Sequence, residues 1–217
     1  MHNFVEQARQ KKGPSVPLVL HGTGGVGKTQ IVREFAFARL TEFSSVFWLD
    51  ARNLQSVRNG LVSFMQKLLD SYVGKSTVTP PPYLRVARYL GVSEAVDKDG
   101  RVTADTAASD RIVSACLQWL DREGNADWLL VFDNVDDLES FRIADFFPAR
   151  MQGIVIITSR RPECGKLGEG WRVQTMKLRE SISLLSKSYG RAIKESDNGK
   201  PSGYVCSFAS LPSLFKH

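Results

Sequence analysis

The eight residues GTGGVGKT, at positions 22–29, decide the fold of this chain. They satisfy the pattern G-x-x-x-x-G-K-[ST], in which the backbone N–H groups of a glycine-rich loop surround phosphate oxygens. The apolar run 16–20 (VPLVL) precedes the loop, and residues 30–40 (QIVREFAFARL) follow it with apolar side chains at helical spacing. Strand, loop and helix are the context that the pattern requires, so the sequence predicts a phosphate-binding loop.

Each residue type in the loop has a physical task. Glycine allows backbone conformations that are closed to other residues, and the loop has glycine at four positions: Gly22, Gly24, Gly25 and Gly27. The ammonium group of Lys28 can bind the β and γ phosphates, and the positive end of the helix dipole points at the same anion. The hydroxyl of Thr29 can bind Mg²⁺. We therefore expect this loop to hold nucleotide phosphates together with Mg²⁺.

Polar residues follow the third apolar run, residues 128–132 (WLLVF). Asp133 ends this run, and a carboxylate at the end of a neighbouring strand can reach Mg²⁺ or its waters, so we predict Asp133 as a metal residue. Asn134 occupies the next position, where a second acid would polarise the attacking water. Because an amide accepts no proton at neutral pH, hydrolysis should be slow or should use Asp136 or Asp137. Those two acids are also typical of a solvated turn.

A pair of arginines, Arg160 and Arg161, follows the apolar run 153–158 (GIVIIT). In parallel α/β sheets, ligands bind at the carboxyl ends of the strands. We therefore consider Arg160 a candidate for contact with the γ phosphate, with an ordinary surface arginine pair as the alternative.

Strands and helices alternate along most of the chain. We expect strands at residues 16–20, 45–50, 128–132, 153–158 and 171–176, and helices at 30–40, 56–72, 83–90, 106–122 and 179–193. Strands that are apolar throughout indicate a parallel sheet covered on both faces. The expected fold is an α/β three-layer sandwich of the P-loop NTPase type, with a five-stranded, mostly parallel sheet. We divide the chain into a lead-in (1–13), a nucleotide-binding domain (14–193) with an insertion or long loop at 73–100, and an irregular tail (194–217).

The composition is typical of one folded domain in a reducing compartment. The 217 residues are 42% hydrophobic and 24% charged, within the globular range. Three cysteines are too few for a disulfide framework and too widely spaced for a CxxC site. No apolar run approaches the roughly eighteen residues of a membrane span, and the N-terminus lacks an apolar signal core. We expect a cytoplasmic protein without a membrane partner. Its net charge of +6 is not concentrated in one basic run, so we expect no specific nucleic-acid partner.

With these pieces in order, the chain resembles the NB-ARC nucleotide-binding domain of STAND-class switch ATPases, the central module of NOD-like immune and cell-death receptors. HGTGGVGKTQ (21–30) looks like the Walker A motif of that family, and VFWLDA (46–51) looks like its second-strand motif. LLVFDNVDD (129–137) is similar to its Walker B motif, and IVIITSR (154–160) to its sensor 1 strand. FWLDA, DNVDD and ITSRR look most like the NOD-like proteins of filamentous fungi. The resemblance covers about residues 14 to 190.

The resemblance implies a molecular switch that binds ADP at rest, exchanges it for ATP and signals through homo-oligomers of a full-length receptor. In that scheme Asp133 serves Mg²⁺ and Arg160 senses the γ phosphate, so that Lys28, Asp133 and Arg160 would serve at most a slow ATPase. The residues that would bind the nucleotide are Gly22, Gly24, Gly25, Val26, Gly27, Lys28, Thr29 and Gln30. The glycine-arginine motif before the P-loop and the winged-helix domain after it have no match here, and residues 210–214 only faintly echo the Gly-Leu-Pro-Leu motif. We interpret the chain as a receptor truncated at both ends.

Three alternatives stay open. A P-loop small-molecule kinase would use residues 73–100 as an acceptor lid, in which Arg85 and Arg88 form the obvious basic pair. An AAA-like ATPase that depends on nucleic acid would show binding that weakens steeply with salt. A degenerate fragment would fold without binding nucleotide.

Overall fold

The computed structural model describes residues 6, 15–72, 82–103, 106–177, 180, 181 and 183. Within them, the strands are β1 (Leu18–His21), β2 (Ser45–Asp50), β3 (Trp128–Asp133), β4 (Ile154–Ser159) and β5 (Glu169–Arg172). The α-helices are α2 (Lys28–Ala38), α3 (Leu54–Tyr72), α4 (Pro82–Tyr89) and α5 (Thr106–Leu120). Short 3-10 turns are η1 (Leu40–Glu42), η2 (Ser93–Ala95), η3 (Ile143–Phe146) and η4 (Pro162–Leu167). No helix in this described part is both long and apolar enough to cross a membrane.

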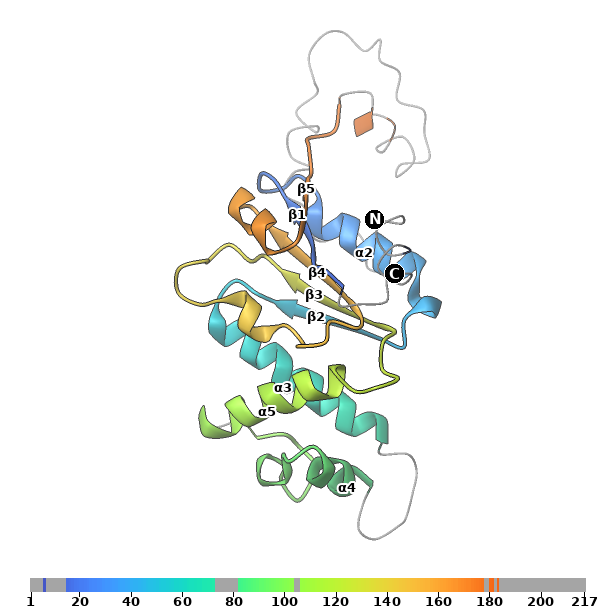
Figure 1. Cartoon of the computed structure of the whole chain (residues 1–217), viewed down its shortest axis with the longest axis vertical. Helices are drawn as coiled ribbons and strands as arrows, with labels where there is room; N and C mark the ends of the chain where they lie inside the picture. The colour runs from blue at the N-terminus through green and yellow to red at the C-terminus, as the bar shows by residue number, and fades with distance from the viewer. Residues whose placement is uncertain are drawn as a thin grey trace.

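The five strands form one sheet in the order β2-β3-β4-β1-β5, and all neighbours are parallel (Figure 1). The strand β4 therefore lies between β1, which leads into the glycine-rich loop, and β3, which ends in Asp133. Because parallel strands end at the same edge of a sheet, the loop after β1, the end of β3 and the end of β4 meet there. The expected α/β class with a five-stranded parallel sheet is confirmed.

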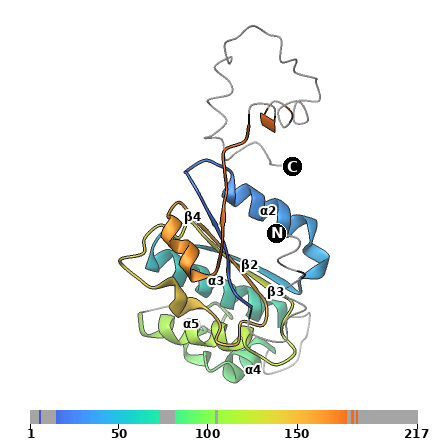
Figure 2. The ribbon, with the colours of Figure 1, turned by 45° about the horizontal axis from the view of Figure 1, so that its top comes forward.

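Helices cover both faces of this sheet, as Figures 1 and 2 show from two directions. On one face, α2 buries Val32 and Ala36 against alternate residues of β1, β3 and β4. On the other face, α3 and α5 pack on the sheet and bury the larger apolar cluster, with Phe64 and Cys116 among its members. Strands buried on both faces need apolar residues at every position, which explains the unbroken run WLLVF in β3. The predicted P-loop NTPase sandwich is therefore the fold observed.

The edge strand next to β1 differs from the expected one. We expected a strand at 171–176, whereas β5 is Glu169–Arg172. Its register is fixed by pairing with β1, because Glu169 N donates to Pro17 O at 2.8 Å. All four β5 residues are exposed, so no apolar run marks the strand in the sequence. Most of the expected helix at 179–193 lies outside the described residues, as do the 194–217 tail and, apart from Glu6, the 1–13 lead-in.

Residues 82–103 pack against the helical layer. Ala87, Leu90 and Val92 are buried in the cluster that contains α3. The side chain of Gln66 on α3 donates to Gly100 O at 3.1 Å and accepts from Val102 N at 2.7 Å. This segment lies at the end of the molecule away from the loop between β1 and α2 (Figure 1). Its place argues against an acceptor lid over that loop.

Candidate functional site

The glycine-rich loop joins β1 to α2 in a conformation that exposes backbone donors. Gly25 and Gly27 have φ values of 76° and 97°, in the left-handed region that favours glycine. Gly27 is the N-cap of α2, with no side-chain cap. Among the described residues, no protein acceptor pairs with the N–H groups of Gly24, Gly25 and Gly27. Free N–H groups at a helix N-terminus form a binding site for an anion.

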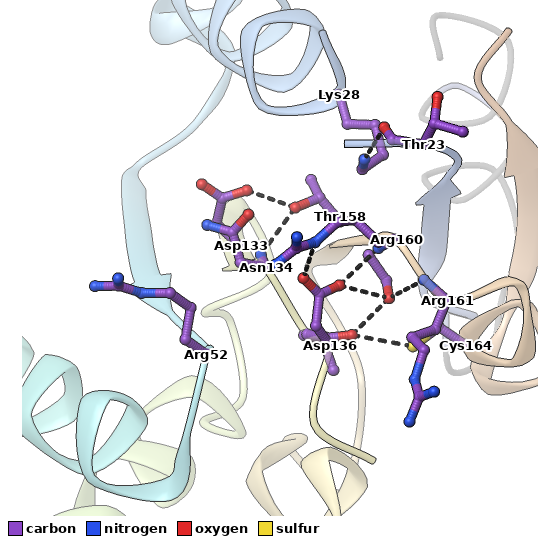
Figure 3. Close-up of polar contacts among 12 residues, drawn as sticks. Thr23, Lys28, Arg52, Asp133, Asn134, Asp136, Thr158, Arg160, Arg161 and Cys164 are labelled. Carbon is purple, nitrogen blue, oxygen red and sulfur yellow. Dashed lines mark hydrogen bonds and ion pairs between the residues drawn. The ribbon is translucent and has the colours of Figure 1, made fainter. Parts of the chain in front are cut away.

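Lys28 lies over this loop and is almost completely buried. Its ammonium group donates to Gly22 O and to Thr23 O, both at 2.9 Å, and Figure 3 shows the contact with Thr23. Burial lowers the pKa of Lys28, the negative charges of Asp136 and Asp133 act to raise it, and the positive charge of Arg160 lowers it further. The ammonium group therefore lies at the loop with only neutral carbonyls as hydrogen-bond partners. Phosphate oxygens would be stronger acceptors for it.

Asp133 lies at the end of β3 and is only 6% exposed. One of its carboxylate oxygens, Oδ1, accepts a hydrogen bond from the Thr29 hydroxyl at 2.8 Å and another from the Thr158 hydroxyl. The two residues that the sequence predicts for Mg²⁺, Thr29 and Asp133, are therefore in direct contact. Hydroxyl and carboxylate oxygens are ligands that suit Mg²⁺, so the donor set fits this ion.

Thr158 is a residue of the site that the sequence analysis missed. It is fully buried on β4, and its hydroxyl accepts from Asn134 N at 3.0 Å while donating to Asp133. Asn134 has φ 65°, a left-handed conformation that asparagine tolerates better than most residues. Thr158 thus fixes both residues at the end of β3. The available signal was a polar Thr-Ser-Arg sequence at the end of an apolar strand.

A second polar cluster joins the loop after β3 to the end of β4. Arg160 donates from its backbone N to Asp136 Oδ1 at 2.6 Å and from Nε to Oδ2 at 2.5 Å (Figure 3). The Ser159 hydroxyl donates to Val135 O at 2.6 Å and accepts from Arg161 N at 2.9 Å. Burial acts to raise the pKa of Asp136, but the hydrogen bonds and charge of Arg160 outweigh it and hold that pKa below its usual value.

The other candidate residues have different neighbours. Asp137 accepts from the backbone N–H groups of Glu139 and Ser140, so it caps a turn. Arg161 pairs with Glu139 at 3.4 Å. The side chain of Gln30 donates to Glu34 at 2.8 Å on the exposed surface of α2, so it does not join the polar groups of the loop.

Two cavities flank the loop. One, of about 680 Å³, is lined by residues that include Gly22, Thr23 and Arg160. The other, of about 440 Å³, lies beside Thr29 and is lined mainly by apolar side chains of α2 and β2, with Trp48 among them. The first cavity therefore joins part of the loop to Arg160, and the second lies beside Thr29.

Comparison with known proteins finds a weakly similar relative and a distantly similar solved structure. No protein-family model matches this chain. The chain is similar, at 25% identity over 221 residues, to a nucleotide-binding leucine-rich repeat (NLR)-like protein of Hyaloscypha variabilis. That alignment covers 92% of this chain, which spans only 19% of the relative's length. A crystal structure of a STAND protein with a tetratricopeptide repeat sensor, from Pyrococcus horikoshii, aligns with 96% of this chain and 26% of its own, at 17% identity and a TM-score of 0.45.

Proposed function

We propose that this chain is the nucleotide-binding switch domain of a NOD-like, STAND-type signalling protein. In this proposal it binds ADP at rest, exchanges ADP for ATP and hydrolyses ATP slowly. The observation that carries the proposal is the 2.8 Å hydrogen bond between Thr29 and Asp133, which joins the phosphate-binding loop to the end of β3. The NLR-like name of the relative supports the signalling context.

Each polar group has a role in this proposal. The N–H groups of Gly24, Gly25 and Gly27 bind phosphate oxygens, and Lys28 exchanges its two carbonyl partners for phosphate. Mg²⁺, when bound, neutralises charge on the β and γ phosphates. Thr29 and Asp133 would hold the ion.

Slow hydrolysis is expected because, in the described part of the chain, each candidate base that follows Asp133 is either an amide or already bound. The next residue, Asn134, is an amide and accepts no proton at neutral pH. Both carboxylate oxygens of Asp136 bind Arg160, and its lowered pKa makes it a weaker base. Asp137 is bound to the backbone of its own turn. The domain is therefore at most a slow ATPase, in which Arg160 contacts the γ phosphate.

The wider context is also a proposal. A NOD-like receptor would form homo-oligomers through the full-length protein, of which an NB-ARC domain is one part. We place the protein in the cytoplasm and, from its DNVDD and ITSRR segments, among fungal proteins of innate immunity. We expect no specific nucleic-acid or membrane partner, because the sequence has neither a long basic run nor an apolar span.

The test is a thermal-shift titration with ADP and with ATP, each with Mg²⁺. A ligand that binds only the folded state, at one hundred times its Kd, stabilises that state by about 2.7 kcal/mol and raises the melting temperature. Lys28→Ala should remove this shift. The control is Lys67→Ala, which removes an exposed lysine on α3 and should leave the shift intact. Equal ADP affinity in wild type and Lys28→Ala would contradict the proposal, and the absence of any shift in the wild type would favour the degenerate fragment.

A further inference from the structure

We propose that Asp136 is a positioning residue for Arg160, and that this pair sets the preference of the site for nucleoside triphosphate over diphosphate. The inference rests on the proposed function. The carboxylate of Asp136 need not touch the nucleotide. It fixes the side chain of Arg160, which does touch the nucleotide in the proposed function.

The first observation is the geometry of the pair. One carboxylate binds both the backbone N–H and the Nε–H of the same arginine, at 2.6 Å and 2.5 Å. The Ser159 hydroxyl also lies 3.3 Å from Asp136 Oδ1. Because two donors of Arg160 bind one planar group, both the backbone and the guanidinium plane of this residue are fixed. A single-contact surface pair would leave the side chain free to rotate.

The second observation is the direction in which Arg160 is held. A Cβ atom placed on Gly24 would lie 3.4 Å from Arg160 Cδ, so the arginine stem lies against the glycine-rich loop. Arg160 also lines the cavity that contains Gly22 and Thr23. Within the described residues, only Nε of the guanidinium has a protein partner. The two terminal nitrogens are therefore donors available to a ligand, on a side chain whose stem lies against the loop. In the proposed function, the phosphate furthest from the nucleoside would bind there.

The third observation is the charge around Lys28. The charges of Asp136 and Arg160 act on Lys28 with opposite signs. Removing the carboxylate of Asp136 therefore has two separable effects. It makes the phosphate site more positive, which acts on the affinity for both nucleotides. It also releases Arg160, which changes the affinity only for the nucleotide whose phosphate contacts that side chain. The ratio of ATP affinity to ADP affinity isolates the second effect.

The alternative role for this pair is a surface ion pair without function. Such pairs contribute little to stability and nothing to nucleotide choice. The Arg160 side chain is 65% exposed but that of Asp136 only 20%, so the acid is the more buried partner and the arginine is the group available to a ligand. This asymmetry is what a positioning residue needs.

The experiment measures dissociation constants for Mg²⁺-ADP and for a Mg²⁺ complex of a non-hydrolysable ATP analogue by isothermal titration calorimetry. Asp136→Asn keeps an acceptor for the backbone N–H but loses the charge-assisted bond to Nε. We expect the ratio of triphosphate to diphosphate affinity to fall about two- to tenfold. A fall of this size corresponds to the entropic cost of fixing one long side chain on binding. Diphosphate affinity should not fall. The control is Asp145→Asn, the same change at a surface aspartate that pairs with Arg142 at 3.8 Å.

Two further variants separate positioning from general damage. Arg160→Lys keeps the charge at an exposed position but cannot bind Asp136 and present two donors at once, so it should lower the same ratio even if Asp136→Asn fails to fold. In an Arg160→Ala background, Asp136→Asn should change the ratio no further, because Asp136 acts through Arg160. A merely structural role would persist in that background.

The outcomes that overturn the inference are specific. An unchanged ratio in Asp136→Asn and Arg160→Lys, or an equal loss of affinity for both nucleotides, would refute the positioning role while leaving the proposed function intact. A further fall of the ratio in the double variant would also refute it. If the wild type binds neither nucleotide, the proposed function fails, and this inference fails with it.

Discussion

Thr158→Val should destabilise the domain, although valine has nearly the same shape as threonine. The change removes the hydroxyl that donates to the buried carboxylate of Asp133 and accepts from Asn134 N. A hydrogen bond to a charged group contributes about 1.5–3 kcal/mol, and a donor left without a partner costs about 1–3 kcal/mol. Because Asn134 is only partly buried, its N–H can partly rehydrate. We therefore expect a loss of about 2–4 kcal/mol in the free energy of unfolding.

The assay is equilibrium unfolding in urea near neutral pH. Thr158→Ser is the matched control, because it keeps the hydroxyl and loses one buried methyl group, which costs about 1 kcal/mol. The serine variant should therefore be the more stable of the two. A valine variant as stable as wild type, or more stable than the serine variant, would refute the argument that this hydroxyl supports the charge of Asp133.

Two other changes test the packing and the chemistry. Gly153→Ala would place a Cβ 2.2 Å from the ring of Trp128, whose Nε1 is held by Leu120 O and Asn125 O at 3.0 Å, so the ring cannot move away. We expect a loss of about 1–3 kcal/mol in a urea titration, and an unaffected midpoint would show that the ring does move. Asn134→Asp restores an acid after Asp133 and should raise the rate of phosphate release from ATP about tenfold or more, whereas a slower variant, or a vigorous wild-type rate, would contradict the proposed slow hydrolysis.

The sequence predicts those parts of the fold in which local pattern and burial agree. The loop at 22–29 and the run before Asp133 have signatures that depend only on neighbouring residues. The strand β5 has none, because its position depends on pairing with β1 and its side chains are exposed. Edge strands of this kind are specified by backbone hydrogen bonds, which no side-chain pattern records.

In the site, too, some residues have a local sequence signature and others depend on which strands are neighbours. Thr29 and Asp133 were expected to share Mg²⁺, and the structure brings them into contact. The roles of Thr158 and Asp136 could not be read from the sequence, because each depends on β4 lying next to β3. Spacing along the chain gives the residues that end a strand but does not give the order of the strands. Only that order decides which strand ends become neighbours.

The position of β4 also has a consequence for synthesis of the chain on the ribosome. Asp133 lies 104 positions after Thr29, and Thr158 lies 25 positions further on. Within the part of the chain that the structure describes, the earliest strand, β1, pairs only with β4 and β5, which are translated much later. The strands β2 and β3 can pair before either of them emerges. The nascent glycine-rich loop must therefore wait, without its sheet neighbours, until more than half of the chain has followed it. In the proposed function, capture of a nucleotide would accordingly be among the last steps of folding rather than a nucleus for it.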